Sequence, residues 1–400
     1  MMETISHSPG WYIKKRFMKN KLAVFGMGFI FLCVIISILG YVILPDSTPN
    51  SNEMCLQLNM LHPMSSVKVL KIRKNKEIES SGFFSRIISG SENPYTIVPI
   101  NDFRFSGDSL IADVYTGLPD KKYSRSFSLP EIIYTLGDSS TINLNGNNLF
   151  FQTKDGKTIF SSIDDLKKQI TEKNIAKKIF LFGTDEFGRD LFSRLLLGTR
   201  ISLFVGLIAV IISLFLGIAL GSMAGFFRGK VDAAIMWLTN VVWSIPTLLL
   251  VIAINLALGK ELWVVFVAVG LTMWVDVARL ARGQIFVVRE MEFVEAGRAL
   301  GFHNFRIITK HVLPNIMGPL IVITASNFAS AILLEAGLSF LGMGVQPPMP
   351  SWGGMIKEYY GYIIFGDVYL AMIPGCAIIL LVLAFNFVGN GLRDALDVKM

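Results

Sequence analysis

The strongest candidates for functional residues lie in a polar stretch of the C-terminal half. In this stretch, Glu295, Gly301 and Pro314 mark the predicted starts and ends of short helices. The residues from Glu295 onward predict a short helix, which Gly301 can end because glycine readily adopts the left-handed backbone conformation. A second helical stretch is predicted over 304–312, and Pro314 suits the first turn of a third helix. This pattern predicts either an ordinary amphipathic loop or a contact helix lying across a membrane face.

Motifs for enzymatic chemistry are absent from the sequence. Gly225–Val231 is glycine-rich, but it has the wrong spacing for a phosphate-binding loop and lacks the hydroxyl that would bind magnesium. There is no His-Glu-x-x-His or Gly-x-Ser-x-Gly motif, and the chain has only four histidines. Its three cysteines have no metal-ligand spacing and form no disulfide framework. We therefore expect no catalytic residue, no metal and no cofactor in this chain.

Hydropathy predicts a membrane protein. Only 17% of the residues are charged, against about 25% in a typical soluble domain. Five long runs lack Asp, Glu, Lys and Arg, and each reaches the roughly 20 residues that cross a hydrocarbon core. A sixth run is shorter and must continue past Asp276, with Arg279 snorkelling to the membrane edge. The predicted spans are 21–44, 201–227, 233–258, 262–281, 315–335 and 368–391.

The basic residues predict the orientation of these spans. Lys and Arg gather in alternate connecting segments, which the positive-inside rule assigns to the cytoplasm. These segments are 1–20, 228–230, 282–314 and 393–399. Both termini are then cytoplasmic, and residues 45–182 lie outside. The net charge of +7 follows from this topology, so nucleic acid is not an expected partner.

The long segment 45–182 predicts a small α+β extracytoplasmic domain inserted between the first two spans. Strand-like stretches at 141–144, 149–152 and 158–160 are separated by turn residues, which favours a β-meander. Residues 162–170 have helical spacing, with Ser161 or Ser162 as N-cap.

Two further sets of polar residues are candidates for sites. A turn before the second span either caps and anchors that helix or contacts an extracytoplasmic partner or substrate. Its candidate residues are Thr184, Asp185, Gly188, Arg189 and Asp190. Glu335 is predicted at the outer end of the fifth span, where it would act as a cap or gate contact. For Asp276, an ion pair with Arg279 at the membrane interface is favoured over a functional role.

The stretch 295–314 resembles the EAA loop of ABC importer permeases. Glu295, Ala296, Gly301, Leu313 and Pro314 match that pattern in type and spacing. Gly297 replaces an alanine, and His311 replaces an isoleucine. The resemblance implies that 282–314 is the coupling loop, whose helix docks on a cytoplasmic ATPase. The implied coupling residues are Glu295, Ala296, Gly297, Arg298, Ala299, Leu300, Gly301, Leu313 and Pro314.

Three other blocks are similar to the C-type subunit of dipeptide and oligopeptide permeases. They begin at Arg16, Gly183 and Glu335 and occur in the family's order, so that the resemblance covers 11–44 and 180–397. It implies an all-α polytopic type I importer permease fold, with a permease core over 183–400. The implied partners are a homologous B-type permease subunit, two ATPases that bind ATP and magnesium, a peptide-binding protein and the lipid bilayer of the cell inner membrane.

Two alternatives remain open at this point. The first keeps the transporter class but changes the cargo to nickel, glutathione or antimicrobial peptides, because the same blocks occur in those systems. The second is a membrane-anchored sensor or adhesion protein that acts through residues 45–182. It leaves the five later spans without a purpose.

Overall fold

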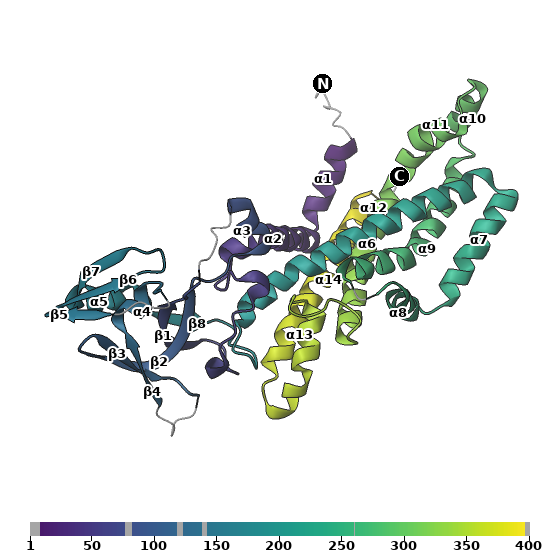
Figure 1. Cartoon of the computed structure of the whole chain (residues 1–400). Coiled ribbons are helices and arrows are strands. Elements are labelled where there is room, and N and C mark those ends of the chain that lie inside the picture. The colour runs from purple at the N-terminus through teal and green to yellow at the C-terminus, as the bar shows by residue number, and fades with distance from the viewer. Residues whose placement is uncertain (1–8, 77–81, 118–122, 138–141, 260, 397–400) are drawn as a thin grey trace. The chain divides into compact units, whose positions relative to one another are not determined.

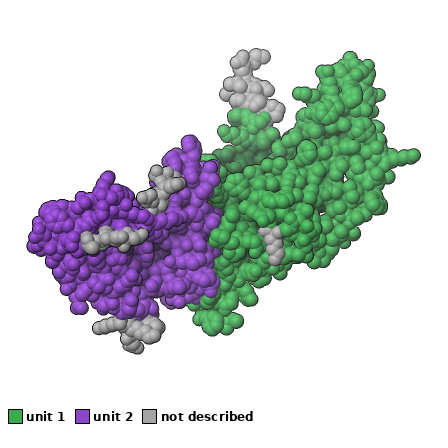
Figure 2. Space-filling model, viewed as in Figure 1, with its two compact units in different colours: residues 1–37, 198–400 green, residues 38–197 purple. Residues whose placement is uncertain are grey.

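The computed structural model describes residues 9–76, 82–117, 123–137, 142–259 and 261–396. The chain divides into two compact units, as Figure 2 shows. The first comprises residues 1–37 and 198–400 and is helical, and the second comprises residues 38–197 and contains the sheets. Two long helices, α2 and α6, belong partly to each unit. Each unit is described by itself below.

The helical unit carries the apolar segments. Five of its described helical segments are long and apolar enough to cross a membrane, and a sixth span results if one sharply bent pair is counted, by length and composition alone. The helices of this unit are α1 (Pro9–Lys19), α2 (Lys21–Ile43), α6 (Leu191–Phe227), α7 (Gly229–Ser244), α8 (Thr247–Leu258), α9 (Leu262–Val288), α10 (Glu292–Ala299), α11 (Asn304–Ile307), α12 (Leu313–Phe340), α13 (Trp352–Tyr359) and α14 (Tyr369–Leu396) (Figure 1).

The segment 233–258 is not the single continuous helix that the sequence predicts, because it consists of two helices, α7 and α8, bent by 91°. The break lies at Ile245 and Pro246. Ile245 is extended, with φ −92° and ψ 128°, as expected for a residue that precedes proline. Pro246 also lacks the N–H that would continue the helical ladder. The run is therefore apolar throughout but not helical throughout.

Other helix ends differ from the apolar runs. The helix α6 begins at Leu191, well before Ile201, and α12 continues past Glu335 to Phe340. The helix α9 runs unbroken through Asp276. An uncharged run marks only the part of a helix that could lie in the hydrocarbon core. The hydrogen-bonded helix itself continues beyond that run into polar residues.

A glycine stripe allows α6 and α9 to pack closely. Gly217, Gly221 and Gly225 recur at every fourth residue and so share one face of α6. A Cβ at any of the three would overlap atoms of α9, beginning with Val277 opposite Gly217. Small residues at this spacing let membrane helices approach at backbone distance. The helix α9 is accordingly the most buried of the candidate spans.

The second unit contains two antiparallel sheets. Five strands lie in the order β4-β3-β2-β1-β8, and three lie in the order β5-β6-β7. The strands are β1 (Ser65–Arg73), β2 (Tyr95–Ser106), β3 (Ser109–Val114), β4 (Tyr123–Ser128), β5 (Asn143–Asn145), β6 (Asn148–Gln152), β7 (Thr158–Ser162) and β8 (Ile175–Phe180). Short helices complete the unit: α3 (Phe83–Ser89), α4 (Leu129–Ile133) and α5 (Ile163–Gln169).

A three-stranded meander and a short helix lie in the region where the sequence predicts a β-meander followed by a helix. The strands β5, β6 and β7 pair in sequence, with Phe150 opposite Phe160. Ser162 is the N-cap of α5, and its hydroxyl accepts a hydrogen bond from the Asp165 N–H at 3.1 Å. Alternate strand residues and one face of each of α4 and α5 form a shared apolar core that includes Leu70, Leu110 and Leu149.

Candidate functional site

The predicted contact helix is α10, and it ends in a Schellman motif. Gly301 has a φ of +74°, and its N–H donates to the Arg298 carbonyl at 2.9 Å. The N–H of Phe302 donates to the Gly297 carbonyl at 3.0 Å. These two bonds satisfy the last helical carbonyls and favour glycine at the left-handed position. The structure confirms the stop at Gly301, although α10 begins at Glu292, one turn earlier than expected.

One side of α10 is exposed and the other is packed. Leu300 and Phe305 are 73% and 71% exposed, which is high for apolar residues in a polar loop. Gly297 is buried, and a Cβ there would lie 3.6 Å from Phe302 and 3.8 Å from Ile307, at ordinary contact distance. The predicted residues that are exposed are Glu295, Ala296, Arg298, Ala299, Leu300, Gly301 and Pro314.

The rest of the loop is held by cations and rings. Arg298 stacks over Phe226 at 5.4 Å, at the end of α6. Arg306 stacks over Phe302 at 4.2 Å. The five residues Ile308–Val312 form a π turn (η4) that leads into α12, with Pro314 in the first turn. The helices α10 and α11 therefore form a supported platform at one end of the helical unit (Figure 1).

The candidates before α6 form a buried cluster inside the second unit. Asp185 is fully buried, and its Oδ1 accepts from the backbone N–H groups of Phe187 at 3.0 Å and Arg189 at 2.9 Å. Its Oδ2 accepts from Arg189 Nε at 2.6 Å and lies 3.8 Å from Arg194 Nε. A carboxylate with several charge-assisted donors organises the turn around itself.

Thr184 and Gly188 join this turn to the segment 55–61, which follows α2. The Thr184 hydroxyl donates to the Leu58 carbonyl and accepts from the Leu61 N–H at 2.9 Å. Gly188 has a φ of +70°, and a Cβ there would overlap the Cys55 carbonyl oxygen. The approach at Gly188 requires a glycine, and the bonds at residue 184 require a side-chain hydroxyl.

Asp190 caps α6. Its Oδ2 accepts from the Ser193 N–H at 3.0 Å and also from the Ser193 hydroxyl. The same hydroxyl accepts from the Asp46 N–H at 3.0 Å. Burial raises the pKa of the Asp190 carboxyl, and the two Ser193 hydrogen bonds oppose that shift. This geometry favours the anchoring role over direct contact with a ligand.

Glu335 is fully buried and lies within α12, which continues beyond it to Phe340. Its Oε1 accepts from the Ser339 hydroxyl at 2.7 Å. The Ser351 hydroxyl donates to Ser339 Oγ at 3.2 Å and accepts from the Gly354 N–H at 3.1 Å. This relay joins α12 to the N-terminus of α13. The sequence does not predict this role for Ser339 and Ser351, because two serines at this separation form no recognisable motif.

The predicted ion pair between Asp276 and Arg279 is wrong. Arg279 Nη2 donates to Asn240 Oδ1 at 2.9 Å, and its guanidinium stacks over Trp243 at 4.2 Å, so it reaches across to α7. Asp276 is exposed and has no ion pair among the described residues. The guanidinium is planar and has several N–H donors, so Arg279 can stack on the ring and donate to the amide at the same time.

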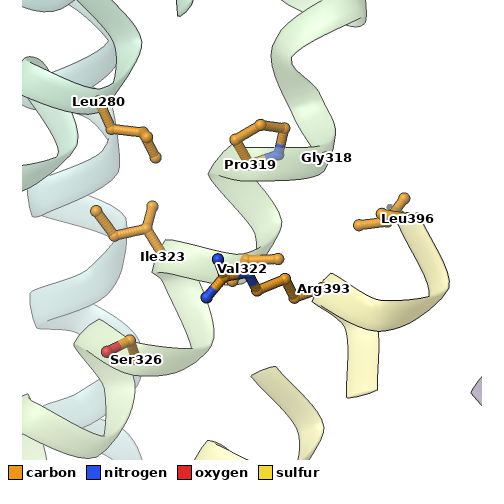
Figure 3. A pocket seen from close by; sticks show the side chains of 8 residues that line it. All are labelled: Leu280, Gly318, Pro319, Val322, Ile323, Ser326, Arg393 and Leu396. Carbon is orange, nitrogen blue, oxygen red and sulfur yellow. The ribbon is translucent and has the colours of Figure 1, made fainter. Parts of the chain in front are cut away.

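A groove of about 610 Å³ lies between α9, α12 and α14 (Figure 3). Its walls are mainly apolar, and the Arg393 side chain extends toward Val322. None of its lining residues is a histidine or a carboxylate, so it offers no acid–base pair for catalysis. The lining residues are Leu280, Gly318, Pro319, Val322, Ile323, Ser326, Arg393 and Leu396.

Comparison with protein families gives two matches. Residues 217–400 match the family described as binding-protein-dependent transport system inner membrane component. Residues 8–59 match the N-terminal transmembrane domain of oligopeptide transport permease C. Residues 60–216 lie between the two matched ranges and include most of the second unit.

Several curated relatives match more than half of the chain. The dipeptide transport system permease protein DppC of Bacillus subtilis is 40% identical over 236 residues, covering 59% of this chain and 74% of that protein. The di/tripeptide permease DppC of Pseudomonas aeruginosa is 44% identical over 221 residues, with 55% and 73% covered. The glutathione transport system permease GsiD of Pectobacterium atrosepticum is 40% identical, with 54% and 72% covered.

The identity and coverage of these relatives, together with the two family matches in chain order, settle the classification. Members of this family are transport components of membranes and not enzymes, which agrees with the motifs absent from the sequence. The chain belongs to the family of inner-membrane permease subunits of binding-protein-dependent transport systems, within its dipeptide and oligopeptide C-type branch.

Proposed function

We propose that this chain forms half of the translocation pore of an ATP-driven importer for dipeptides and oligopeptides. The observation that carries the proposal is the platform of α10 and α11, where α10 has an enforced stop and the apolar side chains of Leu300 and Phe305 are exposed. Relatives named for dipeptide and oligopeptide transport support a peptide cargo. The name of the GsiD relative keeps glutathione as the alternative cargo within the same class.

The proposed topology has six crossings, with α7 and α8 together as the third. Both termini and the platform of α10 and α11 face the cytoplasm, and residues 45–182 face outward. The charges support this orientation, because the helix connections rich in Arg and Lys then share one side. The bent pair fits a crossing only as a broken helix, and such helices are tolerated in membranes where neighbours satisfy the freed backbone groups.

The coupling proposal assigns the exposed face of α10 to a cytoplasmic ATPase. Leu300 and Phe305 would enter an apolar groove of that partner, and Glu295 would meet its rim. When ATP binding closes an ATPase pair, α10 moves with it. The firm supports of this loop, such as Arg298 on Phe226, would then transmit the motion to the spans. The spans would rock between two states, of which ATP favours one through differential contacts.

The remaining partners follow from this architecture. A homologous B-type permease would supply the other half of the pore, and two ATPases would bind all of the ATP and magnesium. An extracytoplasmic binding protein would deliver peptide to the outward side. The turn 184–190 and Glu335 would support that side by holding segments in place, because their polar atoms bond within their own units.

Co-purification and transport together test this function. The tagged chain, isolated from its native membrane, should bring down a second permease, two ATPases and a binding protein. Proteoliposomes containing that assembly should import labelled tripeptides only with ATP and the binding protein. An assembly that imports glutathione or nickel but no tripeptide would overturn the cargo, and a chain isolated without any ATPase would overturn the transporter class.

A further inference from the structure

The sheet unit contains a cleft that neither family match includes. It has a volume of about 590 Å³ and lies beside the paired strands β1 and β2, the strand β4 and the helix α4. Its volume falls within the roughly 300–1,000 Å³ typical of pockets for small molecules. A single inorganic ion would leave most of this space unfilled.

The walls of the cleft combine apolar and charged side chains. Ile72 and Phe127 are buried at its base, and Tyr134 packs beside Phe151 with ring centroids 5.2 Å apart. The strand register brings Thr96 opposite Ile72 on the same face. One side of the cleft can therefore receive an apolar group while its rim stays polar.

Three cations and one carboxylate line the rim: Arg73, Lys74, Arg125 and Glu131. None of the four forms an ion pair with any residue in the described part of the chain. Arg125 stacks over Phe127 at 4.8 Å and Arg73 over Tyr95 at 5.5 Å. Stacking fixes a guanidinium plane and leaves its N–H edge available for a carboxylate.

We propose that this cleft binds a short peptide. The peptide's carboxylate would meet Arg125 and Lys74, its ammonium would meet Glu131, and an apolar side chain would lie against Phe127 and Tyr134. A zwitterion with an apolar body matches both charge signs and the aromatic wall, whereas a simple anion would leave Glu131 unused. The inference rests on the proposed peptide cargo and gives the outward-facing insert a role in receiving it.

Titration calorimetry on the purified full-length chain in nanodiscs tests this site. The probes are the tripeptide Ala-Phe-Ala, its C-terminal amide, its N-acetyl form and inorganic phosphate. The free tripeptide should bind about tenfold more tightly than either blocked form, since each block removes one charge-assisted contact. Arg125→Gln should abolish the preference over the amide, and Glu131→Gln the preference over the acetylated form.

Arg104→Gln is the matched control, because Arg104 is exposed on β2 and does not line the cleft. It should bind all probes as the parent does. Equal binding of free and blocked peptides, tight phosphate binding lost in Arg125→Gln, or no binding to the folded chain would each overturn the proposal. If the protein imports tripeptides but none binds at this cleft, the proposed site is rejected and the proposed cargo stands. If tripeptides bind at the cleft but are not imported, the proposed cargo is rejected instead.

Discussion

Arg282 and Asp232 form a two-pronged ion pair between α9 and α7, with Nε to Oδ1 at 2.5 Å and Nη2 to Oδ2 at 2.7 Å. The two side chains are 29% and 17% exposed. The pair holds the first half of the broken helix against the most buried span. A second pair in the helical unit, Arg228 and Glu290, is much more exposed, at 40% and 61%.

Breaking the half-buried pair should destabilise the helical unit. We expect Asp232→Asn or Arg282→Gln to cost about 1–2 kcal/mol, because a charge-assisted bidentate pair is lost and the remaining partner is half-buried without it. Thermal unfolding in detergent measures this cost, and the double variant should be no worse than either single one. Glu290→Gln, which breaks the exposed pair, should cost less than about 1 kcal/mol. Additive single costs would show that the pair does not couple the two helices.

Gly188 should not tolerate a side chain. Gly188→Ala combines a left-handed backbone with overlap against the Cys55 carbonyl. We expect a cost of at least about 2 kcal/mol, as the sum of strain and overpacking. Gly146→Ala is the control, because Gly146 is also left-handed, at φ +63°, but has open space around it. Limited proteolysis should cleave the first variant faster, and equal rates for both would contradict the close approach.

Asp190 should make stability depend on pH. Its pKa is raised by burial, so the folded state disfavours the charged form. Below the ordinary carboxyl pKa, the carboxyl is protonated in both the folded and the unfolded protein, so its burial carries no charge penalty. As the pH rises through the raised pKa, the free-energy penalty for burying the charged carboxyl grows, and above that pKa it stays constant. In Asp190→Asn this penalty is absent, so the unfolding midpoint of the variant relative to the parent should rise as the pH increases above the ordinary carboxyl pKa. A flat difference would show that the carboxyl is not penalised.

Two glycines of the coupling loop should respond in opposite ways. Gly297→Ala has room for its Cβ and should stabilise α10 by up to about 1 kcal/mol while preserving peptide uptake. Gly301→Ala should disrupt the Schellman stop, at a cost of about 1 kcal/mol or more, and misplace Leu300. ATP hydrolysis should then continue with reduced uptake in proteoliposomes.

Glu295→Ala should likewise uncouple hydrolysis from uptake, since its carboxylate is exposed and free to meet a partner. Glu261→Ala, a change at an exposed residue before α9, serves as the control and should leave uptake unchanged. Normal uptake in both Gly301→Ala and Glu295→Ala would remove α10 from the coupling pathway.

Much of the architecture could be predicted from local sequence. Apolar run lengths located the candidate spans, Gly301 marked the end of α10, and Ser162 marked the start of α5. These features depend on hydropathy and backbone preference over a few residues, which neighbouring residues largely decide. The EAA spacing identified the family for the same reason, because a short helix and its stop are local.

The tertiary structure alone decided the contacts between segments that are far apart in the sequence. Arg279 contacts Asn240 and Trp243 on α7 and not Asp276 on its own helix. The apolar run around Pro246 forms two helices bent by 91° and not one. The turn 184–190 became a buried anchor because segment 55–61 packs on it. The rim of charges around the cleft of the sheet unit arises from strand register. Such arrangements depend on which surfaces meet in three dimensions, and residue type and spacing along one chain do not specify that.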